Sequence, residues 1–228
     1  MHIRVNLKIF LFIAIFYFTK QIEIYGVLML FAFLHEIGHL LCGIFLGLKP
    51  KELKIMPLGL CVSFQVTPDE YNEKIQKGNK IVLKKLAIAI AGPITNFALA
   101  ILYILFPIFS FGMGREIMVY SNLVIGIFNL IPIYPLDGGR ILHHLFHLKL
   151  GLKKANEKIY HITNQTVAIL TAITSIAIYY FKNIALLFIL AYLWYLVIQE
   201  NRMYHIKKHM YEMIQKEKQE SKELESIS

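Results

Sequence analysis

The sequence IYGVLMLFAFLHEIGHLLCGIFLGL, residues Ile24–Leu48, is an apolar run that carries the polar pentapeptide HEIGH at residues 35–39. As a helix it would be about 37 Å long, enough to cross a hydrocarbon core of about 30 Å. His35 lies 11 residues from the start of the run and 13 from its end. Because ionisable groups are costly at mid-membrane depth, the pentapeptide indicates a functional site.

The composition of the whole chain agrees with this interpretation. Hydrophobic residues make up 57% of the 228 residues and charged residues 17%, against about 45–50% and about 25% in soluble domains. The mean hydropathy is +0.54. These values exclude a disordered chain and argue against an ordinary soluble domain. We therefore predict a membrane protein.

The predicted fold class is an all-α polytopic membrane protein with about six transmembrane helices and a short membrane re-entrant β segment. The β segment is Leu60–Val66, where apolar and polar residues alternate with the period of a strand. Residues 1–199 are expected to form the membrane domain, and residues 200–228 a charged cytoplasmic tail. The six expected spans are Val5–Phe18, which is short, Ile24–Leu48, Leu86–Phe109, Ile117–Leu136, Ile159–Phe181 and Ile184–Gln199.

The distribution of basic residues predicts the orientation. With six spans, 21 of the 24 Lys and Arg residues fall on one side, and only Lys20, Arg115 and Lys182 fall on the other. Cytoplasmic loops collect Lys and Arg, so both termini are expected in the cytoplasm of a multi-pass cell (inner) membrane protein. If the first segment does not span, only the N-terminus changes sides. The net charge of +9 is thus interpreted as a topology signal, and no nucleic-acid partner is expected.

Of the 15 acidic residues, 13 are assigned to connections, span margins or the region beyond the last span, which leaves Glu36 within a span and Asp137 at the interrupted end of the fourth. In the H-E-x-x-H pattern on a helix, the two histidines share one face and can reach a single zinc ion. Zinc in a catalytic site keeps one position for water, and Glu36 can take a proton from that water as the general base. The alternative interpretation is a chance match in which His35 and His39 are core histidines.

Asp137 lies in the stretch NLIPIYPLDGG, residues 129–139. Its two prolines and two glycines interrupt the end of a span, and non-helical backbone at membrane depth is tolerated where it lines protein or a watery cavity. We therefore expect the Asp137 carboxylate to turn inward as a third metal ligand. The alternative is an interfacial aspartate that caps the following helix.

Together, the two motifs resemble those of the site-2 protease family of intramembrane zinc metalloproteases (peptidase M50). The resemblance covers residues 30–140 and is to the sporulation subgroup, which processes the pro-sigma-K factor. It implies His35, His39 and Asp137 as zinc ligands and Glu36 as the catalytic base. It also implies that Asn129 orients the substrate or steadies the oxyanion. The implied function is regulated intramembrane proteolysis.

The resemblance has further implications. Ala91-Gly92-Pro93 and Asn96 are similar to another family motif, interpreted as helix packing with an indirect role at the site. Leu60–Val66 resembles the family's re-entrant strand, whose edge could hold an extended substrate. The expected partners are the lipid bilayer, a membrane-associated substrate such as a pro-sigma or anti-sigma factor, and membrane inhibitor proteins. Neither a PDZ insert nor a nucleotide-sensing CBS domain is expected.

Three alternatives stay open at this point. His143 and His147 also stand four residues apart and could form a second metal site, although an interfacial helix explains them as well. Another enzyme class, the CAAX-processing or heat-shock type of membrane metalloprotease, offers no reason for Asp137 in its Pro-Leu-Asp-Gly-Gly setting. A zinc transporter or scaffold without protease activity is the alternative that is not an enzyme.

Overall fold

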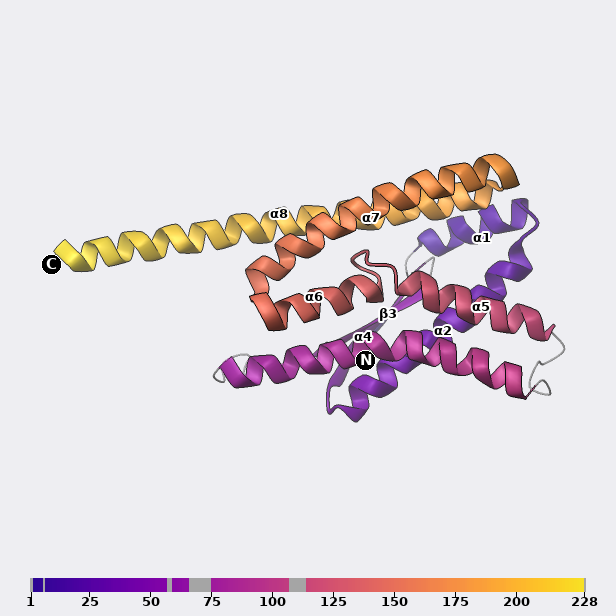
Figure 1. Cartoon of the computed structure of the whole chain (residues 1–228), viewed down its shortest axis with the longest axis horizontal. Helices are drawn as coiled ribbons and strands as arrows, with labels where there is room; N and C mark the ends of the chain where they lie inside the picture. The colour runs from indigo at the N-terminus through magenta and orange to yellow at the C-terminus, as the bar shows by residue number, and fades with distance from the viewer. Residues whose placement is uncertain (1, 6, 57–58, 66–74, 107–113, 228) are drawn as a thin grey trace.

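The computed structural model describes residues 2–5, 7–56, 59–65, 75–106 and 114–227. Within them the chain forms seven helices and three strands, so the fold is mostly helical, as predicted. In Figure 1, α4 to α8 run roughly along the long axis, and α2 crosses them obliquely. The elements are β1 (His2–Val5), α1 (Lys8–Phe18), α2 (Ile22–Phe45), β2 (Lys49–Met56), β3 (Gly59–Gln65), α4 (Ile75–Leu105), α5 (Arg115–Asn129), α6 (Asp137–Leu150), α7 (Leu152–Phe181) and α8 (Ile184–Ile227).

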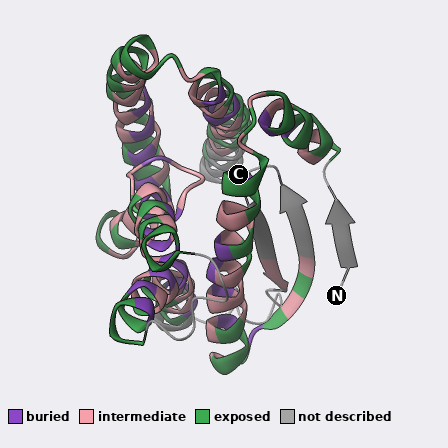
Figure 2. Ribbon diagram, turned by 90° about the vertical axis from the view of Figure 1, so that its right-hand side faces the viewer, coloured by how far each residue is buried: buried purple, intermediate pink, exposed green. Residues whose placement is uncertain are grey.

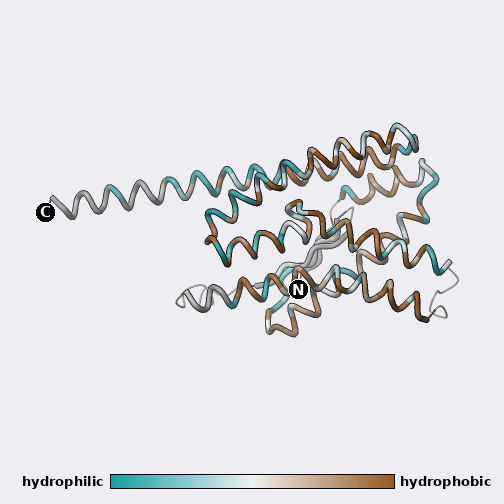
Figure 3. The backbone as a smooth tube through the Cα atoms, viewed as in Figure 1, coloured by the Kyte–Doolittle hydropathy of each residue, from teal (hydrophilic) through white to brown (hydrophobic). Residues whose placement is uncertain are grey.

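Four stretches of the described helices are long and apolar enough to cross a membrane: Ile22–Phe45, Lys80–Leu105, Leu152–Phe181 and Ile184–Met213. They account for four of the six expected spans, apart from residues 107–109, which lie outside the described residues. Side chains on these helices face outward without protein cover; Phe45 at the end of α2, for example, is 91% exposed. Figure 3 shows the apolar stretches gathered in the part of the bundle away from the C-terminus.

The other two expected spans are not confirmed. Helix α1 has only 11 residues, which is about 17 Å and too short to cross alone. Helix α5 has 15 residues and ends at Asn129 instead of continuing to Leu136. The physical reason is the pair Pro132 and Pro135, because a proline lacks the N–H that a helix needs and disfavours helical backbone in the residue before it.

The three strands form one sheet in the order β1-β2-β3, with β1 parallel to β2 and β2 antiparallel to β3. The predicted strand is therefore confirmed over residues 60–65, while Val66 lies outside the described residues. Its re-entrant position in a membrane stays a prediction. The sheet packs against α2, where the ring of Phe64 lies over Gly43 with no room for a Cβ. One edge of β3 has no partner among the described strands.

Three apolar clusters hold the helices together. The first joins α2, α4 and α5 through Phe31, Tyr103, Met118 and Ile125. The second joins the segment between α5 and α6 to α7 and α8, and the third joins α1, α2 and α8. Figure 2 shows the buried residues on the inner faces of the helices.

Helices α7 and α8 form a hairpin. Its turn is at Lys182, whose φ of 49° lies in the left-handed region, and Asn183 follows. In Figure 1, α8 runs back beside α7 and then projects beyond the bundle to the C-terminus. The expected division at residues 199/200 falls inside this one helix, and it stays a prediction.

Phe31 and Phe33 offer a test of the packing, since they lie two residues apart on α2. Phe31 is fully buried, whereas Phe33 is 43% exposed. We expect Phe31→Ala to lower the free energy of unfolding by about 3–5 kcal/mol through the cavity that it leaves. Phe33→Ala should cost far less, because its ring faces detergent or lipid. Unfolding titrations in mixed micelles measure both, and equal losses would contradict the burial of Phe31 and the exposure of Phe33.

Candidate metal centre

Three buried side chains converge between α2 and α6. His35 and His39 lie one turn apart on α2, Asp137 is the first residue of α6, and each is 3–4% exposed. Asp137 Oδ2 lies 2.8 Å from His35 Nε2 and 3.1 Å from His39 Nε2, and the two Nε2 atoms are 3.1 Å apart. The structure thus brings together the three predicted ligands, and they could hold a metal ion.

The interrupted segment between α5 and α6 delivers Asp137 to this point. Gly138 and Gly139 let the start of α6 lie directly on the backbone of Leu130, Ile133 and Tyr134, where a Cβ would overlap main-chain atoms. A hydrogen bond of 3.0 Å from the Tyr134 amide to Thr163 Oγ1 ties the segment to α7. This backbone contact explains the two glycines that follow Asp137 in the sequence.

Each histidine is oriented by a partner on its other ring nitrogen. His39 Nδ1 lies 2.6 Å from the carbonyl oxygen of Ile88 on α4. His35 Nδ1 contacts Oδ1 of Asn96, also on α4. Both partners are acceptors, so both Nδ1 atoms must carry the proton. In the neutral rings, the Nε2 atoms then present lone pairs toward Asp137.

This arrangement needs positive charge at its centre. Two imidazole lone pairs and a carboxylate oxygen within 3.1 Å of one another repel unless a cation or two extra protons lie between them. Two protons would leave two imidazolium rings with their N–H groups facing each other at a buried site, which is costly. The ligand atoms of a tetrahedral zinc site lie roughly 3.3 Å apart. The donor set therefore fits a metal ion of that size.

Gly92 gives the site its space. Helix α4 passes so close to the centre that a Cβ at position 92 would overlap the imidazole of His39 and Nε2 of His35. The neighbouring Pro93 leaves one backbone hydrogen bond of the same turn unmade. The Ala91-Gly92-Pro93 motif, interpreted from sequence as packing, thus also bounds the site directly.

Glu36 lies beside the centre and is half-buried. It makes no hydrogen bond or ion pair within the described part of the chain. The ionisable groups nearest to it are His35, His39, Asp137 and Arg140. Since no described side chain is bonded to its oxygens, the carboxylate is available to a water molecule. Its assignment as the base stays a prediction.

Asn129 is not brought into the cluster by any contact. It is half-buried at the end of α5, and its side-chain amide donates a hydrogen bond of 3.0 Å to the carbonyl of Ile125. One N–H of the amide stays available for a substrate. Its assignment to substrate or oxyanion therefore stays a prediction.

Two residues near the centre were missed by sequence reasoning. Arg140 lies 3.6 Å from Asp137 Oδ1, one turn along α6. Asn122 on α5 is completely buried and contacts Asn96. The signal for Asn122 was available, because a side-chain amide in the middle of the apolar stretch Ile117–Leu136 requires a partner.

His143, His144 and His147 do not form a second group of metal ligands in the described part of the chain. His143 Nε2 instead contacts Asn156 Oδ1 on α7 at 2.7 Å. Helix α6 is not among the candidate spans. Burial lowers the pKa of His144 to about 3, helped by His143 and Lys85. The pKa values of His143 and His147 are lowered as well, also mainly by burial.

With this geometry established, comparison with known proteins identifies the family. The sequence model of Peptidase family M50 matches residues 24–116 and 113–174, a region that includes all three converging residues. The chain belongs to peptidase family M50. The structure is similar to the site-2 protease from Methanocaldococcus jannaschii, with a TM-score of 0.64 and 25% identity over 87% of this chain and 89% of that one.

Two curated relatives of this M50 chain are similar in sequence. Zinc metalloprotease MJ0392 of Methanocaldococcus jannaschii is 27% identical over 179 residues, 76% of this chain and 48% of the relative. Stage IV sporulation protein FB of Bacillus subtilis is 31% identical over 133 residues, 57% of this chain and 42% of the relative. The chain thus spans about half the length of the curated relatives it matches.

Gly92 allows a sharp test of the metal centre. We expect Gly92→Ala to lower the affinity for zinc tenfold or more, because the added methyl group overlaps both imidazole rings. Gly26→Ala is the matched control, since a Cβ at that position of α2 meets nothing within 4 Å. Competition with a chelator measures the affinity of each folded variant. Unchanged zinc binding by Gly92→Ala would contradict the geometry.

The lowered pKa of His144 predicts acid sensitivity. In the unfolded chain this pKa returns to about 6.5, so below that pH unfolding takes up a proton and stability falls with falling pH. We expect His144→Leu to lose about 2 kcal/mol less than the natural chain between pH 7 and pH 5. His209→Leu, at an exposed position of α8, is the control. Unfolding titrations at both pH values decide; identical pH slopes for His144→Leu and the natural chain would disprove the assignment.

Proposed function

We propose that this chain is an intramembrane zinc metalloprotease that hydrolyses a peptide bond in or near the membrane. The observation that carries the proposal is the buried convergence of His35, His39 and Asp137, with Glu36 beside them on the same candidate span. Membership of family M50 and the names of the relatives support it. The membrane setting follows from the four candidate spans.

In this proposal His35, His39 and Asp137 hold the zinc ion. When bound, zinc acidifies a water molecule and polarises the carbonyl of the scissile peptide bond. The protein contributes neutral rings with their lone pairs already aimed at one point, because Asn96 and the Ile88 carbonyl hold the protons on Nδ1. Arg140 stays with Asp137 Oδ1 at 3.6 Å, which leaves Oδ2 turned to the histidines.

Glu36 moves the protons. Its carboxylate takes one proton from the attacking water and afterwards gives a proton to the nitrogen of the departing amine. It can do both because it lies next to the first ligand and is not engaged by another described side chain. Asn129 would offer the free N–H of its amide to the substrate carbonyl that carries the developing negative charge.

The sheet offers a way to bind the substrate. A helical transmembrane segment hides its peptide bonds in intrahelical hydrogen bonds, so it must be extended before water can attack. The open edge of β3 could receive the extended segment as an added strand. Since Phe64 of β3 packs on Gly43, one turn beyond His39, this edge belongs to the same part of α2 as the proposed zinc ligands.

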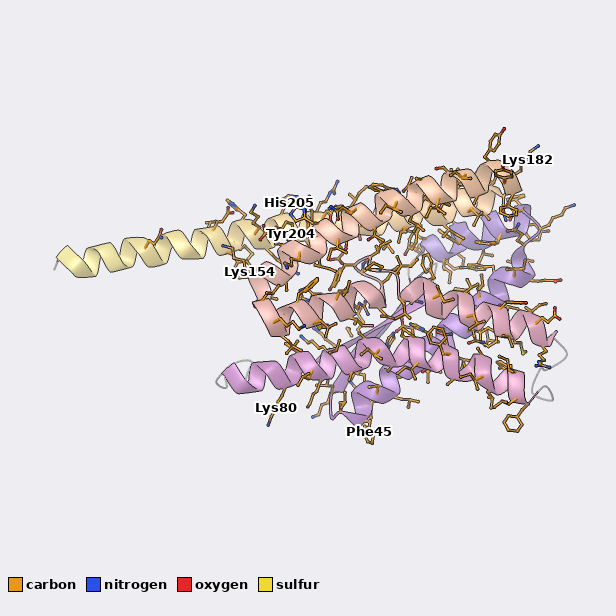
Figure 4. All side chains as sticks on the ribbon, in the orientation of Figure 1. Phe45, Lys80, Lys154, Lys182, Tyr204 and His205 are labelled. Atoms are coloured by element: carbon orange, nitrogen blue, oxygen red, sulfur yellow. The ribbon has the colours of Figure 1, made fainter. Side chains whose placement is uncertain are left out.

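We further propose that the C-terminus is cytoplasmic, as is the N-terminus if the first apolar segment spans. Figure 4 shows Lys80 and Lys154 near one end of the bundle and Lys182 at the opposite end, as the charge distribution predicts. The substrate would be a membrane-associated protein presented from the cytoplasmic side. Similarity to stage IV sporulation protein FB favours a role in sporulation, and the motif resemblance given above adds a pro-sigma or anti-sigma factor as the proposed substrate. Membrane inhibitor proteins would be further partners.

Replacing Glu36 by Gln tests the mechanism. We expect cleavage of a co-expressed membrane-tethered substrate to fall by about 10²–10⁴-fold, because the amide cannot accept the proton. Zinc content and folding should stay unchanged. The control is Glu23→Gln in the exposed first turn of the same helix, which should cleave normally. Full cleavage by Glu36→Gln would overturn the assigned role.

The same experiment separates the proposal from a zinc transporter or scaffold. With Asp137→Asn, a protease should lose zinc and cleavage together, because Oδ2 faces both histidines. Loss of zinc with no cleavage product even in the natural chain, across a panel of tethered transcription factors, would favour transport.

A further inference from the structure

A relay of two hydrogen-bonded side-chain amides, those of Asn122 and Asn96, leads from α5 to His35. Asn122 Nδ2 donates to the Met118 carbonyl at 2.8 Å, and Asn96 Nδ2 donates to Asn122 Oδ1 at 3.0 Å. Asn96 Oδ1 then faces His35 Nδ1. Both asparagines are completely buried, so neither amide exchanges its partners for water.

The direction of the hydrogen bonds in this relay is fixed at one end, by the carbonyl of Met118. A backbone carbonyl can only accept a hydrogen bond, so the Met118 carbonyl requires the NH₂ group of Asn122. The oxygen of Asn122 must then face Asn96 and accept from its NH₂ group. That bond in turn leaves the oxygen of Asn96 for His35, whose Nδ1 must carry the proton.

We infer that Asn122 is a positioning residue that sets the tautomer of His35 through Asn96 and thereby keeps His35 Nε2 free to bind the metal. The inference rests on the proposed function in one respect, namely that the site takes zinc. Asn122 touches neither a ligand atom nor a substrate. It acts by fixing which way the next amide points.

Without Asn122 the polarity of the relay is lost. Rotation of the Asn96 side chain by half a turn would present NH₂ to His35 Nδ1, which would then have to accept. The proton of His35 would move to Nε2, where it blocks metal binding. His39 needs no such device, because its Nδ1 faces the Ile88 backbone carbonyl, which cannot reverse.

The protein contains a second asparagine relay that serves as a matched control. In α7 and α8, Asn201 Nδ2 donates to Asn164 Oδ1 at 2.8 Å, and Asn164 Nδ2 donates to the Tyr160 carbonyl at 3.0 Å. Asn164 therefore occupies the same position in its relay as Asn122 does in the first. No bond of this second relay ends on a residue of the metal centre. Asn164→Leu removes the same chemistry from a membrane helix without touching His35.

The test compares five variants with the natural chain in detergent: Asn122→Leu, Asn122→Thr, Asn96→Leu, Asn164→Leu and the double change of Asn96 and Asn122 to Leu. Competition with a chelator gives zinc affinity, and ¹⁵N-histidine NMR of the metal-free protein gives the tautomer of His35, identified by its loss in His35→Gln. Circular dichroism and gel filtration select the folded variants. A Thr hydroxyl can still donate to the carbonyl four residues back and accept from Asn96.

We expect Asn122→Leu to bind zinc about 10–100-fold more weakly, the usual cost of losing a partner outside the ligand set. Its His35 signal should show the Nε2–H tautomer, while His39 stays unchanged. Asn122→Thr should recover most of the affinity, and Asn164→Leu should bind zinc normally. The double change of Asn96 and Asn122 to Leu should be no weaker than Asn96→Leu alone.

Failure of this inference and failure of the proposed function give different results. Natural affinity and an unchanged His35 tautomer in folded Asn122→Leu would overturn the inference and leave the proposed function standing. Absence of zinc binding by the natural chain would overturn the proposed function, whereas the tautomer in the metal-free protein would still decide the role of Asn122.

Discussion

The structure depends on one electrostatic constraint: two imidazole lone pairs and one carboxylate oxygen are held within 3.1 Å of one another at a buried site. Such a group is unfavourable without positive charge at its centre, and nothing in a hydrocarbon environment relieves it. The partners of the two Nδ1 atoms keep the lone pairs aimed inward. In an ordinary protein core this repulsion would be destabilising, but here it makes the three side chains suited to bind a metal ion.

Close packing of helices holds these three side chains together despite their repulsion. Between helices in a bilayer there is no hydrophobic driving force, so association relies on small residues, van der Waals contact and polar bonds. Gly92 lets α4 approach the two imidazoles, and Gly138 and Gly139 let α6 lie on the backbone before it. Around these contacts, one apolar cluster joins α2, α4 and α5, and another joins the segment before α6 to α7 and α8. Any larger side chain at these glycines would move a ligand.

The same arrangement joins chemistry to substrate binding. Helix α2 carries His35 and His39 and, one turn further on, packs against β3 through Gly43 and Phe64. The candidate metal centre and a strand whose outer edge has no partner among the described strands thus share one support, which is the geometry that the proposed hydrolysis of an unwound transmembrane segment would require. Membership of family M50 and similarity to a solved site-2 protease agree with this division of labour.

The sequence by itself determined that this chain lies in a membrane, that HEIGH sits on an apolar helix, and that Asp137 follows an interrupted helix. It also predicted the strand at residues 60–65. These are local properties, since hydropathy, helical spacing and the backbone limits of proline and glycine act within a few residues.

The tertiary structure decided the rest. The length of α5, the approach of α4 at Gly92, the meeting of Asp137 with His35 across 102 positions, and the relay through Asn122 all depend on contacts between helices. Such contacts leave no period in the sequence, because a buried amide or glycine acquires its role only from the residue that packing places opposite it.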